Sequence, residues 1–151
     1  MERALVSLRA TETHRELLTE AVDCAGDDDE LVVLWHLDAA EYDADVTTLE
    51  SVGRVENTDY THRSVVEGAA GDAREFVEST VSTAGLDVRI VVSVDSADSR
   101  AQRVLDAATD HDCDHVFIVG TDRSPTGKAV FGDFAQAVIL NFDGFTTVVT
   151  D

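Results

Sequence analysis

Three glycines that follow a short apolar run give the chain its clearest candidate for chemistry. Gly120, Gly127 and Gly132 lie between the apolar residues 116–119 and a helix-like run that begins near residue 132. A buried strand that leads through a glycine-rich loop into a helix is a common way of holding phosphate, because backbone N–H groups and the positive end of the helix dipole face the anion. The pattern predicts an anion or nucleotide pocket.

The middle of this loop carries side chains that can donate hydrogen bonds to an anion. Ser124 and Thr126 precede Gly127, and Lys128, the only lysine of the chain, follows it. Residues 124–128 are therefore candidate pocket residues. The alternative is that they form only a turn, because proline and glycine stand where a β-turn favours them.

Two charged residues decide whether such a pocket accepts phosphate. Asp133 follows Gly132 and brings negative charge to the start of the helix, where we expect it to act as the cap. Two like charges about 4 Å apart repel by roughly 4 kcal/mol at an effective dielectric constant of 20, which lowers phosphate affinity about a thousandfold. Arg9 either grips a phosphate or pairs with Asp133 or Asp122 and fills the pocket. We favour the ion pair with Asp133.

Short apolar runs alternate with helical patterns along the whole chain. Because strands that alternate with helices indicate βαβ units, the sequence predicts a parallel sheet in an α/β fold, with any ligand at the carboxyl ends of the strands. The acidic residues 38–59 are expected to form a surface excursion with one short helix. Strands are predicted at 4–8, 31–37, 88–94, 115–119 and 145–150, and helices near 11–25, 65–81, 99–110 and 132–141.

With these elements in this order, the chain resembles universal stress proteins over its whole length. The resemblance depends on Trp35–Leu37 at the end of the second strand, on Cys113–Asp114 before the fourth, and on the glycine loop and helix at 120–140. It implies a three-layer α/β/α, doubly wound, Rossmann-like domain over residues 1–151, with a five-stranded sheet of order 3-2-1-4-5. We include Leu37 among the candidate pocket residues.

The ATP-binding members of that family carry a glycine motif that this chain keeps only in part. The motif is Gly, two residues, Gly, nine residues, then Gly followed by Ser or Thr. Gly120 matches the first glycine, and Gly132 matches the last after a shortening of one residue. Arg123 replaces the middle glycine, and Asp133 replaces the hydroxyl residue.

Two further positions depart from the family pattern. Arg9–Thr11 stands where the first strand usually ends in an Asp-Gly-Ser-like turn, and Asp98 replaces a glycine before the helix at 99–110. The resemblance therefore implies a dimeric, stress-response-type binding or regulatory module with little or no ATP binding, rather than an enzyme. An ATP- or AMP-binding sensor, with slow ATP hydrolysis, is the alternative.

The histidines outside this loop are interpreted structurally. Residues 111–115 contain metal-ligand types, but a closed zinc site needs four ligands, usually from two separated pairs, and no second pair exists. We therefore predict no metal site. His36 ends an apolar run, and no Ser or Cys nucleophile can be placed with it from the sequence, so we predict a hydrogen-bonded strand-end residue and no catalytic residue.

The charge balance is extreme, with 31 acidic residues, 20 of them aspartate, against 11 basic ones and a net charge of −20. Such a chain repels itself in dilute buffer, whereas in molar salt the Debye length falls to about 3 Å. The composition resembles that of halophile cytosolic proteins.

The chain lacks the cluster of basic residues that binding to nucleic acid requires. Its first apolar run is too short for a signal peptide or a membrane span. We predict a cytoplasmic protein without nucleic-acid or membrane partners.

The last strand is the second functional candidate. Residues 145–150 are expected at the edge of the sheet, where backbone donors and acceptors are normally covered. Pairing with a second copy across a two-fold axis would cover them, and the family resemblance favours this homodimer. A paralogue or another protein could take the same place. The alternative is a monomer in which the charges of Asp143 and Asp151 prevent another strand from pairing with this edge.

Overall fold

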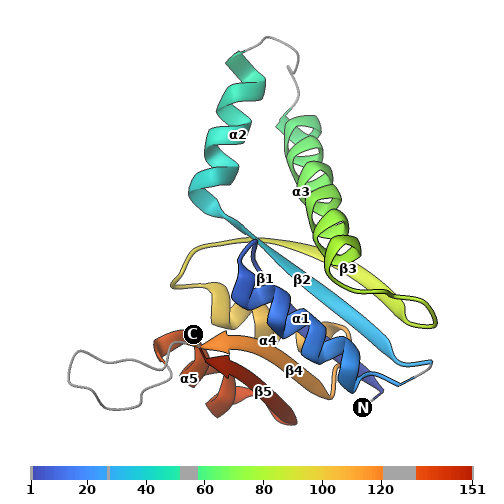
Figure 1. The fold of residues 1–151 in the computed structure, drawn as a ribbon. Helices are drawn as coiled ribbons and strands as arrows, with labels where there is room; N and C mark the ends of the chain where they lie inside the picture. The colour runs from blue at the N-terminus through green and yellow to red at the C-terminus, as the bar shows by residue number, and fades with distance from the viewer. Residues whose placement is uncertain (1, 27, 52–57, 121–131, 151) are drawn as a thin grey trace.

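In the computed structural model, five parallel strands form one sheet of order β3-β2-β1-β4-β5, with helices on both faces (Figure 1). The predicted three-layer, doubly wound α/β/α class and strand order are therefore confirmed. The structure describes residues 2–26, 28–51, 58–120 and 132–150. The elements are β1 (Arg3–Leu8), α1 (Glu12–Cys24), β2 (Glu30–Asp38), α2 (Ala39–Ser51), α3 (Thr58–Thr80), β3 (Asp87–Asp95), α4 (Arg100–Asp110), β4 (His115–Gly120), α5 (Gly132–Asn141) and β5 (Phe145–Thr150).

The sheet is buried on both faces at its centre, which explains the nearly continuous apolar runs of β1, β2 and β4. Helices α1 and α3 pack on one face, where Leu17, Leu18 and Phe76 meet side chains of β1 and β2. Helices α4 and α5 pack on the other face, where Val104 and Val138 belong to a second apolar cluster. Because all five strands are parallel, their carboxyl ends lie at the same edge of the sheet.

The start of α1 follows from local chemistry. Thr11 has an extended backbone, and its hydroxyl accepts a hydrogen bond from the His14 backbone N–H at 3.1 Å. This bond satisfies one of the helix-start donors that have no intrahelical acceptor. The cap directs α1 away from the end of β1 and leaves Arg9 and Thr11 at the carboxyl edge of the sheet.

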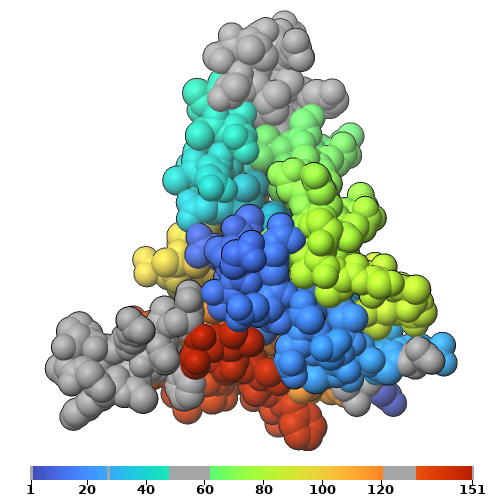
Figure 2. Space-filling model, in the orientation of Figure 1, coloured from blue at the N-terminus to red at the C-terminus, as the bar shows by residue number. Residues whose placement is uncertain are grey.

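The segment after β2 is more helical than the sequence pattern indicated. Instead of one short helix within an excursion, α2 runs directly from the end of β2 through Ser51, and α3 begins at Thr58 rather than near Val65. The helix pair rises from the carboxyl edge of the sheet as a projection (Figures 1 and 2). Within it, the Tyr42 hydroxyl lies 2.7 Å from His62 Nδ1. The apolar stripe from which the helix was predicted begins at Val65, so it did not reveal these additional turns.

None of the helices in the described part of the chain is both long and apolar enough to cross a lipid bilayer.

Candidate functional site

A cavity of about 290 Å³ lies where the connections of the sheet diverge. The chain leaves β1 for the helix layer of α1, whereas it leaves the neighbouring β4 for the layer of α5. Open α/β sheets bind their ligands at such a switch point. The cavity contains four of the predicted residues, Arg9, Gly120, Gly132 and Asp133. Its other lining residues are Ser7, Thr11, His14, Arg100, Val119, Phe134 and Ala135.

The start of α5 is built as the glycine pattern predicted, but Asp133 has a different place in it. Gly132 has a φ of +77°, a left-handed conformation that favours glycine. Helix α5 begins at Gly132, so Asp133 lies within its first turn and is not the residue that caps it. Its exposed carboxylate still adds negative charge at the positive end of the helix dipole.

The predicted ion pair between Arg9 and Asp133 is not present. Both residues line the 290 Å³ cavity, yet the described side chains include no ion pair of Arg9 with Asp133 within 4.0 Å. Arg9 is exposed, as is Asp133. An ion pair between two exposed side chains gains little free energy in water, which explains why this pair does not form. Asp122, the other partner considered, lies outside the described residues.

A second, larger cavity of about 490 Å³ shares Arg9 and Thr11 with the first. Leu37 is mostly buried and lines this second cavity rather than the first, together with Trp35 and Phe76. The Arg15 guanidinium stacks over the Phe76 ring at 4.3 Å. Four carboxylates against two guanidinium groups give the lining a net negative charge. The acidic residues are Asp38, Glu41, Asp72 and Glu75.

The remaining predicted pocket residues cannot be placed. Ser124, Thr126, Gly127 and Lys128 lie outside the residues that the structure describes. The anion cradle predicted for residues 124–128 therefore stays a prediction.

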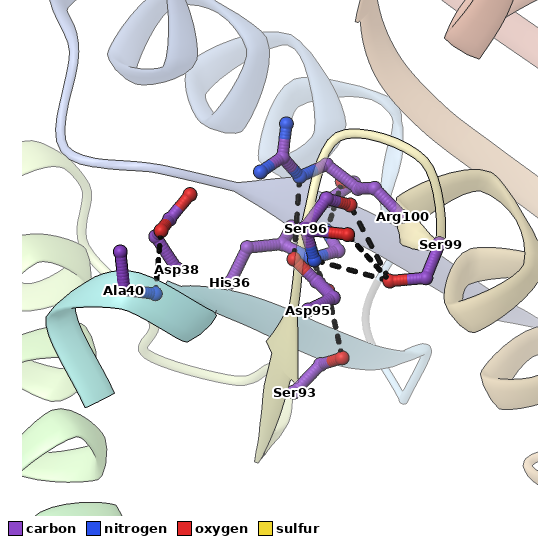
Figure 3. A network of polar contacts seen from close by, with 9 residues as sticks. His36, Asp38, Ala40, Ser93, Asp95, Ser96, Ser99 and Arg100 are labelled. Carbon is purple, nitrogen blue, oxygen red and sulfur yellow. Dashed lines mark hydrogen bonds and ion pairs between the residues drawn. The ribbon is translucent and has the colours of Figure 1, made fainter. Parts of the chain in front are cut away.

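The structure assembles a polar network around His36 that sequence reasoning missed. His36 Nδ1 lies 2.5 Å from Asp95 Oδ2, and His36 Nε2 lies 2.6 Å from Ser7 Oγ. The Ser93 hydroxyl donates to Asp95 Oδ2 at 2.8 Å, and Arg100 Nε lies 3.4 Å from Asp95 Oδ1. Figure 3 shows His36, Ser93 and Arg100 meeting at Asp95. The prediction that His36 is a hydrogen-bonded residue at the end of its strand is therefore confirmed, whereas its partner Ser7, from β1, could not be placed beside it from the sequence.

The network is almost entirely buried, although Ser7 lines the 290 Å³ cavity and His36 lines the 490 Å³ cavity. The side chains of His36 and Asp95 are 1% and 0% exposed, and Ser7 is 2% exposed. Ser7, His36, Ser93 and Asp95 come from three neighbouring strands, β1, β2 and β3, and continue the α4/α5 face of the sheet toward its carboxyl edge. Among the described residues, no buried side-chain nitrogen or oxygen lacks a hydrogen-bond partner.

The protonation states follow from burial and hydrogen bonding. Burial lowers the pKa of His36 and outweighs the opposing effect of Asp95, so the ring is neutral near pH 7. Burial alone would raise the pKa of Asp95, but hydrogen bonds from His36 and Ser93 and the charge of Arg100 hold it below its ordinary value. Because the ionised Asp95 carboxylate can only accept hydrogen bonds, His36 carries its proton on Nδ1. Its Nε2 is therefore unprotonated and accepts a hydrogen bond from the Ser7 hydroxyl.

The region 111–115, considered above for metal binding, connects α4 to β4. His115 stacks on Phe117 at 4.3 Å, and its Nε2 lies 2.7 Å from Thr147 Oγ1. Burial raises the pKa of the Cys113 thiol to about 11, so it is not a reactive thiolate. In the parts of the chain that the structure describes, no group of three or more His, Cys, Asp or Glu side chains could hold a metal ion.

Comparison with known proteins supports the fold alone. No protein-family model matches the sequence, and no curated protein matches it closely. Among solved structures, the universal stress protein UspA from Lactobacillus plantarum is 18% identical with a TM-score of 0.57, covering 97% of this chain and 96% of that one. The universal stress protein from Archaeoglobus fulgidus is 17% identical with a TM-score of 0.54, covering 98% of each.

A universal stress protein solved in complex with cAMP is also similar, with 10% identity, a TM-score of 0.59 and coverage of 99% of this chain and 96% of that chain. The fold is that of the universal stress proteins. With so little sequence identity, the universal-stress-protein fold identifies the architecture alone, and the chemistry of the site must be argued from this chain's own residues.

Proposed function

We propose that residues 1–151 form one ligand-binding module of the universal-stress type, which holds a small molecule at the carboxyl edge of the sheet and has little affinity for ATP. Asp133 carries this proposal. Its carboxylate lines the 290 Å³ cavity in the first turn of α5, at the helix end where a phosphate would otherwise bind. The net negative lining of the 490 Å³ cavity adds to the repulsion of a triphosphate.

A nucleotide with a single phosphate is the second candidate ligand. Arg9 and Arg100 both line the smaller cavity, so they can offset the one to two negative charges of a single phosphate group there. The similar protein solved with cAMP supports a ligand of this size and charge. This candidate corresponds to an AMP-type sensor.

The charge of Asp133 gives the first prediction. We expect Asp133→Ser to raise ATP affinity at least tenfold at low salt, and less in molar KCl, because salt screens an exposed carboxylate. Isothermal titration of ATP, AMP and cAMP into the parent and the variant measures this. Asp23→Ser is the matched control, because it removes the same charge from an exposed position near the far end of α1. An equal ATP affinity of the parent and Asp133→Ser would contradict the proposal.

A further inference from the structure

The hydrogen-bond order Ser7–His36–Asp95 is that of a serine nucleophile with its general base. Two hydrogen bonds make up this order: Ser7 Oγ lies 2.6 Å from His36 Nε2, and His36 Nδ1 lies 2.5 Å from Asp95 Oδ2. In serine hydrolases the same order lets the histidine take the hydroxyl proton while the aspartate fixes the ring tautomer. The constellation is recognised by geometry and not by sequence order or fold.

We propose that Ser7 is an activated nucleophile that attacks short-chain carboxylic esters bound in the 290 Å³ cavity. The proposal rests on the proposed function in one respect, because it takes that cavity as the ligand site. The nucleophile proposal goes beyond the proposed function because it assigns covalent chemistry to a module for which the sequence favoured binding alone.

Access is the first requirement, and the cavity meets it. Ser7 is 2% exposed, yet it is one of the residues that line the 290 Å³ cavity. His36 and Asp95 do not line this cavity, so an ester bound there would meet Ser7 and not its two partners; His36 lines the 490 Å³ cavity instead. The apolar walls formed by Val119, Phe134 and Ala135 fit a short acyl chain.

Stabilisation of the oxyanion is the second requirement. Gly132, Asp133 and Phe134 all line the cavity and belong to the first turn of α5, where backbone N–H groups have no intrahelical acceptor. These N–H donors favour the negative oxygen of a tetrahedral intermediate through direct hydrogen bonds, while the exposed Asp133 carboxylate offsets the contribution of the helix dipole. The Arg100 guanidinium adds positive charge to the same wall while its Nε lies 3.4 Å from Asp95.

The reaction balances with water as the only co-reactant. Ser7 Oγ bonds to the ester carbonyl carbon while its proton moves to His36 Nε2. The bond between that carbon and the alcohol oxygen then breaks, and the alcohol leaves with the proton from His36. Water attacks the acyl-Ser7 ester with His36 as base, which releases the carboxylic acid and restores the Ser7 hydroxyl. The neutral ring of His36 and the ionised carboxylate of Asp95 are the states that these steps need.

The test uses the full chain in molar KCl. A fluorophosphonate probe should form an adduct that peptide mass spectrometry maps to Ser7, and p-nitrophenyl acetate should be hydrolysed faster than p-nitrophenyl decanoate. Ser7→Ala should lose both the adduct and the hydrolysis. His36→Gln should slow labelling at Ser7 by a hundredfold or more, because the general base is removed. Urea unfolding of each variant shows that it is folded.

Ser82→Ala is the matched control, because Ser82 is exposed in the segment between α3 and β3 and is remote from the network. It should leave labelling and hydrolysis unchanged. The labelling rate of the parent should also fall as acid protonates His36. The absence of an adduct at Ser7 on the folded parent protein, or labelling of Ser82 at an equal rate, would overturn the proposal. The ATP titration of Asp133→Ser does not involve Ser7, so the two proposals can fail separately.

Discussion

At the scale of single residues, His36 shows how burial can set a protonation state against a neighbouring charge. Its Nδ1 faces the Asp95 carboxylate, which favours the protonated ring, while Arg100 and Arg9 disfavour it. Burial is the largest effect, and it keeps the ring neutral. A neutral ring donates a hydrogen bond to Asp95 and accepts one from Ser7 at the same time, so it satisfies both of these buried partners.

This protonation state has a consequence for stability. Because the pKa of His36 is lowered on folding, the unfolded chain takes up its proton near the ordinary value of about 6.5, before the folded protein does. The unfolded state therefore binds more protons on acidification, and the free energy of unfolding falls as the pH drops below about 6.5. We expect this fall to be smaller in His36→Gln.

Urea unfolding at pH 7.5 and pH 5.5, at one fixed molar KCl concentration, measures the difference. His62→Gln is the control, since His62 is an exposed histidine outside the network. His115, whose pKa burial also lowers, is present in all three proteins and sets the remaining acid sensitivity. An equal acid-induced fall for the parent and His36→Gln would show that His36 does not carry the effect.

At the scale of elements, the turn between α5 and β5 is held by one close backbone approach. Gly144 has a φ of +153°, and a Cβ there would lie 2.8 Å from the Asp114 carbonyl oxygen and 2.7 Å from Phe142 Cε2. The same oxygen accepts the Phe145 N–H at 3.1 Å, which aligns β5 beside β4. The turn therefore needs glycine for both conformation and space.

We expect Gly144→Ala to lower the free energy of unfolding by about 1–3 kcal/mol, because backbone atoms must shift. Gly71→Ala is the matched control: Gly71 lies in α3, and an added Cβ meets no atom within 4 Å. That change should stabilise the protein by roughly 0.5–1 kcal/mol through helix propensity. Urea unfolding in molar KCl compares the three proteins. Equal stability of the Gly144→Ala and Gly71→Ala proteins would contradict this account of the turn.

The elements themselves could mostly be predicted, whereas the network at their ends could not. Strands buried on both faces give continuous apolar runs, so β2 and β4 were predicted to within one residue at each end. The early turns of α3 have no such stripe and were missed. Ser7, His36 and Asp95 are separated by 29 and 59 residues, and only the strand register brings them together. Isolated polar residues near the ends of apolar strands were the available signal.

At the scale of the whole molecule, the edge strand β5 remains the candidate dimer interface. Among the described residues, the exposed large apolar side chains are Ile139, Leu140 and Phe145, which all belong to α5 or β5. Leu140 and Phe145 are 79% and 73% exposed. A second copy that paired along β5 would cover the strand edge and bring this apolar surface near a two-fold axis.

We expect the parent to sediment in molar KCl as a dimer, and the double variant Leu140→Asp/Phe145→Asp to sediment as a 16.3 kDa monomer. The added carboxylates would repel their copies across the axis and would need to be desolvated. Thr19→Asp, which adds charge at an exposed position of α1, should leave the dimer intact. A 16.3 kDa parent at all protein concentrations would refute the interface.

The net charge of −20 sets how the whole fold should respond to salt. With 31 acidic and 11 basic residues, most carboxylates have no basic partner, so their mutual repulsion opposes the compact state. We expect the urea midpoint to rise steeply as KCl increases to about 0.5 M, where the Debye length is already near 4 Å, and to change little beyond it. Sucrose at matched osmolality is the control, because it favours burial without screening charge. A midpoint that rises as much with sucrose as with KCl would assign the effect to hydration rather than to charge repulsion.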